Sequence, residues 1–170
     1  VWMGDYGYVS LMPQIGEKIK VLPEDRQIIF DHKQEKATPY YYSINLPSEN
    51  KKNIKAEISA ASRCALFRFT FPWSESEIFK GKTEQTGTRM GAYVEFATAN
   101  KEQVLAQIST SFISLEQARI NMEKELPDWD FDRLCQMTKQ AWNDKLSKIE
   151  VSGIEDNDKS IFYTALYHCY

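Results

Sequence analysis

The sequence has few of the residues that build metal centres and disulfide frameworks. Its 170 residues include two histidines and three cysteines. His32 and His168 each lack a second histidine or a cysteine at ligand spacing, which argues against a zinc site within the chain. Cys64, Cys135 and Cys169 are widely separated and match no Cys-x-x-Cys spacing, so we interpret them as small, buried hydrophobic side chains.

An excess of charge of one sign and a long apolar run are also missing. The chain carries 24 acidic and 21 basic side chains, mixed along the sequence, with a formal net charge of -3. Such a chain offers no positive field to a polyanion, which argues against nucleic-acid binding. No apolar run approaches the roughly 20 residues of a bilayer-spanning helix, so we expect no membrane span. Catalytic Ser/His/Asp or Cys/His arrangements and a Gly-rich phosphate loop are not found either.

The first part of the sequence shows a pattern typical of β-strands. With 42% hydrophobic and 13% aromatic residues, the chain can form a packed core. Apolar side chains recur at every second position over 54–60 and 65–71, which is the period of strands with one buried face, and Pro72 ends the second run. Further strands are expected over 8–12, 41–46, 92–98 and 104–112, with turn residues between them. This pattern predicts a mostly β chain that folds as an antiparallel β-sandwich.

The hydrophobic period becomes helical after Phe112. Ser114 with Gln117 forms a capping box for a helix that ends near Leu126. Asp130 is the expected N-cap of a second helix. The apolar face of that helix consists of Phe131, Leu134, Thr138, Ala141, Trp142 and Ile149.

A third helix is expected between Gly153 and the last residue. Its apolar side consists of Ile161, Phe162, Ala165, Leu166 and Cys169. Exposing such a stripe costs about 25 cal/mol per Å². We therefore expect it to pack on the sheet, on the preceding helix or on another molecule.

Two separate blocks carry a more specific pattern. In DHKQEKATPYYYSINL, residues 32–39 read His-x-x-Glu-x-Ala-x-Pro, two tyrosines follow at 41 and 42, and AEISAASRCALFRFTFP comes next. The second block runs from 114 to 170 and contains SLEQARINMEKELPDWDFDRL, QAWNDKLSKIEVSG and KSIFYTALYHCY. Both resemble, in order, segments of glycoside hydrolase family 92, the exo-acting α-mannosidases, and GDYGYVSLMP at the start resembles a third. Tyr40 replaces the usual glycine of the motif, and Phe67 stands where a histidine is common.

The resemblance implies a division of the chain and an activity for the whole protein. Residues 1–113 would form an apparently incomplete β-sandwich, 114–152 a helical linker, and 153–170 the first helix of an (α/α)6 catalytic barrel that is otherwise absent. The true N-terminus is expected upstream of Val1. The interval from Phe79 to Gly91 is shorter than in the family, either by natural deletion or because residues were omitted.

The resemblance also implies calcium-dependent, inverting release of terminal α-linked mannose from a glycan substrate. The general acid, the general base and the calcium ion would belong to the protein's own C-terminal catalytic domain. No catalytic residue and no metal ligand is then expected among residues 1–170. This chain would serve as scaffold and as one wall of the pocket, and we expect a periplasmic or secreted location.

Four residues are candidates for substrate binding. Trp2 and Asp5 lie in a Gly-punctuated loop, where a ring can face sugar C–H groups and a carboxylate can accept hydrogen bonds from hydroxyls. Packing is the alternative for Trp2. His32 and Glu35 lie three residues apart in the family-like motif, and the alternative for His32 is a local hydrogen bond that holds the turn before Pro39.

Two other interpretations remain open or are rejected. DWDFD, residues 128–132, superficially resembles the start of a calcium loop but lacks the glycine and glutamate of an EF-hand, and we interpret its acids as helix-start carboxylates. The alternative for the whole chain is a non-catalytic β-sandwich that binds carbohydrate or protein. Further helix pairs with inward-facing carboxylates after Tyr170 would favour the enzyme.

Overall fold

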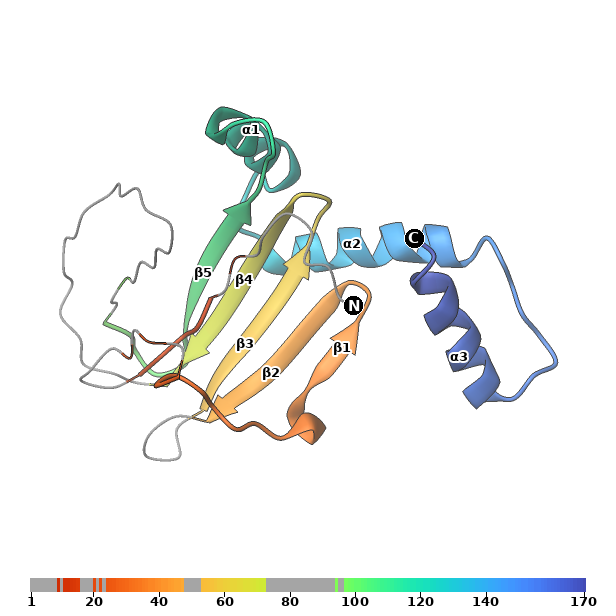
Figure 1. Ribbon diagram of the computed structural model, residues 1–170, viewed down its shortest axis with the longest axis horizontal. Helices are drawn as coiled ribbons and strands as arrows, with labels where there is room; N and C mark the ends of the chain where they lie inside the picture. Colours follow the sequence, from red (N-terminus) through yellow and green to blue (C-terminus); the bar gives the residue numbers. More distant parts are fainter. Residues whose placement is uncertain are drawn as a thin grey trace. The chain divides into compact units, whose positions relative to one another are not determined.

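The structure, a computed structural model, describes residues 9, 11–15, 20, 22, 24–47, 53–72, 94 and 97–170 (Figure 1). Of the strand predicted over 8–12, residues 9, 11 and 12 are described, and they are not in a strand. Of the strand predicted over 92–98, residues 94, 97 and 98 are described, and only Thr98 takes part in β-bridge pairing. The short interval between Phe79 and Gly91 lies wholly outside the described residues.

The described strands form one antiparallel sheet. Its five strands follow the sequence in the order β1-β2-β3-β4-β5, and neighbouring arrows in Figure 1 run in opposite directions. β1 pairs with β2 in a register that places Lys36 opposite Ser43 and Thr38 opposite Tyr41. The bounds are β1 (Lys36–Thr38), β2 (Tyr41–Pro47), β3 (Asn53–Ala60), β4 (Cys64–Phe71) and β5 (Glu102–Ser109).

Helices follow the sheet, which confirms the predicted fold class: mostly β with antiparallel strands, then helices. They are α1 (Leu115–Glu125), α2 (Phe131–Leu146) and α3 (Asp156–Tyr167), and a short 3-10 helix, η1 (His32–Gln34), precedes β1. None of the described helices is long and apolar enough to cross a membrane.

The predicted N-caps are present. Ser114 Oγ accepts a hydrogen bond of 3.0 Å from the Gln117 amide, and Asp130 Oδ1 accepts one of 2.9 Å from the Arg133 amide. The capping box at α1 is only half formed, because the Gln117 side chain donates to Asn121 Oδ1 instead of reaching back to Ser114. Each cap satisfies an amide that has no partner within the helix, and this defines where α1 and α2 begin.

The chain divides into two compact units. The first comprises Val1–Phe30, Asn45–Ala56 and Phe69–Gln103. In it, Ile54 and Phe69 are buried. The Lys101 amide donates to the Phe71 carbonyl at 3.0 Å, and Thr98 Oγ1 donates to the Pro72 carbonyl at 3.3 Å.

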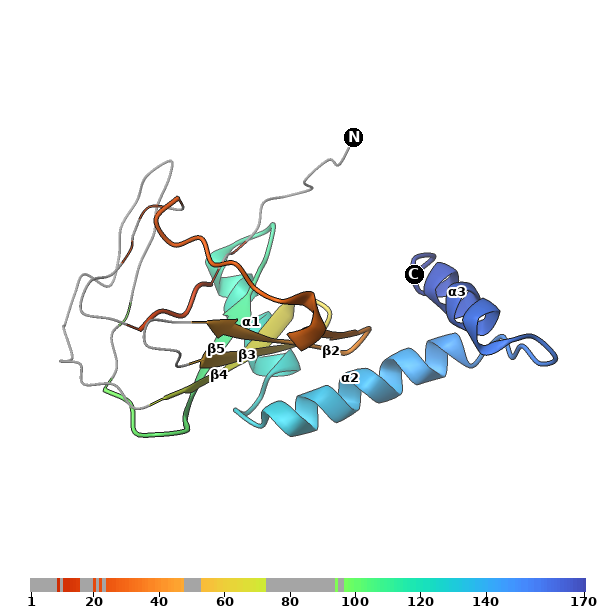
Figure 2. The ribbon, with the colours of Figure 1, turned by 90° about the horizontal axis from the view of Figure 1, so that it is seen from below.

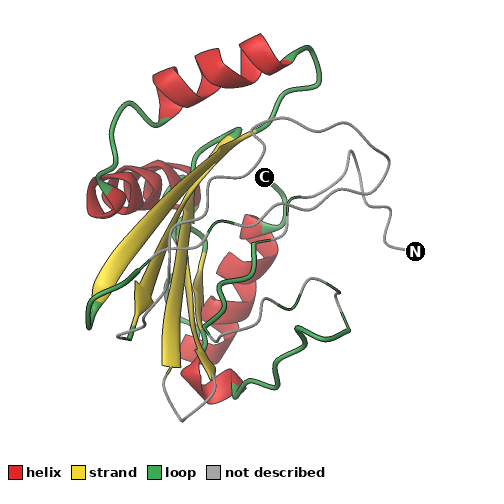
Figure 3. Ribbon diagram, turned by 90° about the vertical axis from the view of Figure 1, so that its left-hand side faces the viewer, coloured by secondary structure: helices red, strands yellow, loops and turns green. Residues whose placement is uncertain are grey.

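The second unit comprises Asp31–Ile44, Glu57–Arg68 and Val104–Tyr170. Here α2 lies against one face of the strands, and α1 lies across the end of the sheet at which β5 finishes (Figures 2 and 3). The core between them consists of Cys64, Leu66, Leu126, Phe131 and Leu134, with Tyr41, Ala61, Leu105 and Met122 packed against it.

The sequence pattern predicts one buried face of the sheet, but residues on both faces of β3 are buried. Ile54, at one of the alternating apolar positions, is buried as predicted, but Glu57 and Ser59, on the opposite face of β3, are also buried, with 3% and 2% of their surface exposed. Ser59 Oγ donates to the Tyr40 carbonyl at 2.9 Å, and Glu57 accepts from Tyr41 and Arg68. These polar groups tolerate burial because each has a hydrogen-bond partner.

The apolar stripe predicted for α3 is only partly covered within this chain: Phe162 and Leu166 are half-buried, whereas Ile161, at 60%, Ala165 and Cys169 are exposed. Packing of the exposed part on another molecule stays a prediction. Within the chain, α3 contacts α2 through tyrosines: the Tyr167 and Trp142 rings lie 4.7 Å apart, and Tyr170 Oη donates to the Lys145 carbonyl at 3.4 Å.

Replacing Leu66 by alanine tests the core assignment. Leu66 has 0% of its surface exposed, so Leu66→Ala should lower the free energy of unfolding by about 2–5 kcal/mol through lost burial and a residual cavity. Leu115→Ala is the control, because Leu115 is 73% exposed and its truncation should change stability by less than about 0.5 kcal/mol. Urea denaturation followed by circular dichroism measures both. Equal losses in the two variants would contradict the assignment.

Candidate functional site

The candidate site begins with the turn of η1. Asp31 caps this turn: its Oδ1 accepts a hydrogen bond of 3.0 Å from the Lys33 amide. The Glu35 amide then donates to the His32 carbonyl at 3.2 Å. One turn of 3-10 helix places residues i and i+3 above one another, so His32 and Glu35 share a side.

Glu35 is the centre of a three-residue cluster. His32 Nδ1 lies 2.9 Å from Glu35 Oε2, and Tyr42 Oη donates to Glu35 Oε1 at 2.5 Å. His32 is exposed, with 82% of its side-chain surface accessible, whereas Glu35 is 25% accessible. We call these residues, His32, Glu35 and Tyr42, the Glu35 cluster. Each carboxylate oxygen has one partner in the protein and retains capacity to accept a hydrogen bond from a ligand.

The electrostatics of the cluster favour a charged carboxylate. The hydrogen bonds from Tyr42 and then from His32 hold the pKa of Glu35 below its ordinary value. Burial, and then the hydrogen bond to Glu35, raise the pKa of Tyr42 to about 12. Glu35 is therefore ionised and Tyr42 protonated near neutral pH, an arrangement suited to accepting hydrogen bonds and unsuited to donating a proton as a general acid.

The cluster lies on the sheet face opposite α2. Side chains alternate across a strand, so neighbouring Tyr41 and Tyr42 point to opposite faces. Tyr41 contacts the α2 side, where its ring meets Phe131 edge-on at 6.3 Å. Tyr42 reaches Glu35 on the other face.

Family models match both ends of the chain. The model described as the glycosyl hydrolase family 92 N-terminal domain matches residues 1–77, and the model described as the family 92 catalytic domain matches residues 117–170. The two matches occur in the order of the two domains and together cover most of the sequence. The chain belongs to glycosyl hydrolase family 92.

Solved structures of family 92 proteins share the fold. An inverting mannosidase from Bacteroides thetaiotaomicron superposes with a TM-score of 0.72 at 24% identity, over 89% of this chain and 28% of that one. An α-mannosidase from the same organism superposes with a TM-score of 0.72 at 22% identity, over 92% of this chain and 31% of that one. The described sheet and helices are therefore a fold found in family 92 enzymes.

A fungal sequence extends the comparison. A protein of Arthroderma benhamiae, named as an uncharacterized secreted glycosidase, is 33% identical over an alignment of 85 positions that covers 46% of this chain and 11% of that protein. The chain thus spans about a tenth of this relative and less than a third of the solved ones.

Of the predicted site residues, the structure brings together His32 and Glu35. The local hydrogen bond considered as an alternative role for His32 is present, while the substrate-binding role remains a prediction. Trp2 and Asp5 lie outside the described residues. The sequence analysis missed Tyr42 as the partner of Glu35. The available signal was strand alternation, which places Tyr42 on the opposite face of the sheet from Tyr41.

The acids of DWDFD are engaged as helix-start carboxylates and in ion pairs. Asp128 lies 2.6 Å from Arg133 Nη2, and this contact lowers the pKa of Asp128. Asp130 caps α2, and Asp132 lies 3.0 Å from Arg68. Within the described ranges, no three His, Cys, Asp or Glu side chains are placed to hold a metal ion. The described residues therefore do not fit a calcium site.

Removing the tyrosine hydroxyl tests the assignment of the cluster. Because folding lowers the pKa of Glu35, the cluster contributes stability above the unfolded-state pKa, and this is lost as pH falls through the folded-state value. Tyr42→Phe should raise the Glu35 pKa towards the ordinary value of a glutamate side chain, because the hydrogen bond from Tyr42 is the largest cause of the lowering. Carboxyl-carbon NMR titration measures this, with Tyr40→Phe as the neighbouring control. An unchanged Glu35 titration in Tyr42→Phe would refute the hydrogen bond.

Proposed function

We propose that these 170 residues are the N-terminal part of an enzyme that releases terminal α-linked mannose from glycans by calcium-dependent, inverting hydrolysis. The observation that carries the proposal is the pair of family 92 matches, N-terminal domain followed by catalytic domain. The names of the solved relatives, an inverting mannosidase and an α-mannosidase, supply the substrate and the stereochemistry. The name of the fungal relative supports a secreted or periplasmic location.

In this proposal the general acid and base lie outside residues 1–170. Inverting hydrolysis needs a protonated acid and an ionised base about 6.5–9.5 Å apart. The best-placed acids here are committed to other contacts: Glu57 is buried against Arg68, and the pKa of Glu35 is lowered by its partners. Neither environment favours the protonated carboxyl that the general acid requires. The calcium ion is likewise assigned to the C-terminal catalytic domain.

The role proposed for this chain is scaffold and pocket wall. Glu35 is already ionised and oriented, so it can accept hydrogen bonds from sugar hydroxyls without reorganising. His32, exposed beside it, offers a second polar contact. Trp2 and Asp5 remain in the proposal as an apolar face and an acceptor from the loop that precedes the first predicted strand.

Activity assays on two lengths of the protein test the proposal. The full-length protein should hydrolyse an aryl α-mannoside in calcium and lose activity in excess chelator, whereas residues 1–170 alone should be inactive in both conditions. Turnover by the short chain would overturn the scaffold role. A full-length protein inert towards every α-mannoside tried would favour the alternative, a non-catalytic β-sandwich that binds carbohydrate or protein.

Glu35→Gln in the full-length protein tests the pocket wall. The substitution keeps the shape and removes the charge, so KM for a mannoside should rise several-fold with a smaller change in kcat, because a contact made equally in ground and transition states is weakened. Asp144→Asn is the matched control, since Asp144 lies on α2 and accepts from Gln140. Equal kinetics for Glu35→Gln and the wild type would remove Glu35 from the site.

A further inference from the structure

The buried carboxylate of Glu57 is held at three points. Arg68 Nε donates to Glu57 Oε2 at 2.9 Å, Arg68 Nη2 donates to Oε1 at 3.0 Å, and Tyr41 Oη donates to the same Oε1 at 2.8 Å. Glu57 is almost fully buried, and 15% of the Arg68 side chain is accessible. This two-point fork fixes the plane of the guanidinium on the sheet.

The same guanidinium also contacts the first two residues of α2. Arg68 Nη1 donates to Asp132 Oδ1 at 3.0 Å, and the Arg68 Cζ atom lies 4.2 Å from the centroid of the Phe131 ring. Phe131 is buried in the core. The Arg68 side chain therefore makes two hydrogen bonds to the Glu57 carboxylate on β3, and it also makes an ion pair and a cation–π contact with the start of α2.

These contacts join the segments matched by the two family models. Glu57 and Arg68 lie in the segment that matches the N-terminal domain, and Phe131 and Asp132 lie in the segment that matches the catalytic domain. A second arginine, Arg63, also bridges the two segments, through Glu125 at the end of α1. Arg63 is half exposed, and no ring contact accompanies its ion pair among the described residues.

We propose that Arg68 is a positioning residue that fixes the first turn of α2 on the sheet and so determines where, and in which direction, the segment matched by the catalytic-domain model leaves the N-terminal domain. Loss of the guanidinium releases this turn while the strands stay paired. The inference concerns the joint between the segments and holds whatever reaction the whole protein performs.

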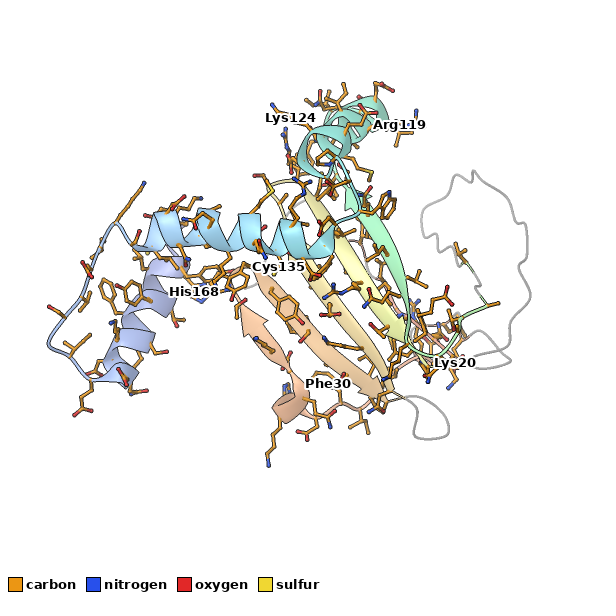
Figure 4. All side chains as sticks on the ribbon, turned by 180° about the vertical axis from the view of Figure 1, so that it is seen from behind. Lys20, Phe30, Arg119, Lys124, Cys135 and His168 are labelled. Atoms are coloured by element: carbon orange, nitrogen blue, oxygen red, sulfur yellow. The ribbon has the colours of Figure 1, made fainter. Side chains whose placement is uncertain are left out.

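The three cysteines supply reporters for this release. Cys135 is half-buried on α2, one turn after Phe131, and is labelled in Figure 4. Burial raises the pKa of the Cys135 thiol, and the charges of Asp132, Arg68, Lys139 and Glu57 act on it more weakly. Cys64 is buried in the core cluster that also contains Phe131, so it reports opening of that core. Cys169 is exposed and reports the intrinsic rate of reaction with the reagent.

The test is the rate of alkylation of each cysteine by iodoacetamide, resolved by mass spectrometry, in the double variant Glu57→Gln/Arg68→Met. Removing both charges avoids an unpaired buried carboxylate, which would unfold the sheet for an unrelated reason. Tyr41 can still donate to the glutamine. The rate is followed against pH, because its plateau reports access of the reagent to the thiol and its midpoint reports the thiol pKa.

The expected result is local. The plateau rate of Cys135 should rise on the order of tenfold, because local opening of α2 becomes more frequent. The rate of Cys64, which shares its core with Phe131, should rise less, and that of Cys169 should stay as in the wild type. The matched double variant Arg63→Met/Glu125→Gln should leave Cys135 unchanged. An unchanged Cys135 rate in the first variant would overturn the proposal. A rise of the Cys64 rate as large as that of Cys135 would also overturn it, because it would show loss of the whole fold.

Discussion

The junction between the sheet and α2 depends on a buried charged pair, which two neighbouring strands form beneath the start of the helix. Moving the Glu57 carboxylate and the Arg68 guanidinium out of water is costly, and their attraction offsets this only with good geometry and a full set of hydrogen bonds. Here the fork, the Tyr41 hydroxyl, the Asp132 carboxylate and the Phe131 ring provide both. Removing one partner of such a pair typically costs about 3–5 kcal/mol.

Because its partners come from separate elements, the pair links their formation. Tyr41 belongs to β2, Glu57 to β3, Arg68 to β4 and Asp132 to α2. A partly assembled unit leaves at least one of these polar groups buried without a partner, which is unfavourable in a low-dielectric core. The network therefore favours the complete arrangement over partial ones, a form of specificity that an apolar core supplies less strongly.

Local features were the most predictable from sequence. Ser114 and Asp130 cap helices as expected, because an N-cap depends on a short side chain and an amide three residues away. Strand alternation identified which residues of β3 share a face. It did not show that a helix from much later in the chain covers Glu57 and Ser59, because alternation says nothing about what packs on a face.

The candidate site was predictable in part for the same reason. His32 and Glu35 meet within one turn, so their spacing indicated the contact. The partner of Glu35 on its other oxygen, Tyr42, comes from a paired strand, and identifying it requires the register of β1 and β2. The contact of α3 with α2 was not indicated by the predicted apolar stripe, because Tyr167, whose ring contacts Trp142, is not part of that stripe.

The hairpin between β1 and β2 has a consequence for how this sequence can vary. Two hydrogen bonds join Thr38 and Tyr41 across the turn. Thr38 Oγ1 donates to the Tyr41 carbonyl at 2.9 Å and accepts from the Tyr41 amide at 3.0 Å. The two-residue turn, Pro39 and Tyr40, thus determines to which face of the sheet each side chain of β2 points. A change in the length of this turn by one residue would exchange the faces of Tyr41 and Tyr42, and the buried ion pair and the Glu35 cluster would each lose a hydroxyl at the same time. Insertions and deletions in this turn are therefore constrained jointly by a helix on one face of the sheet and a carboxylate on the other.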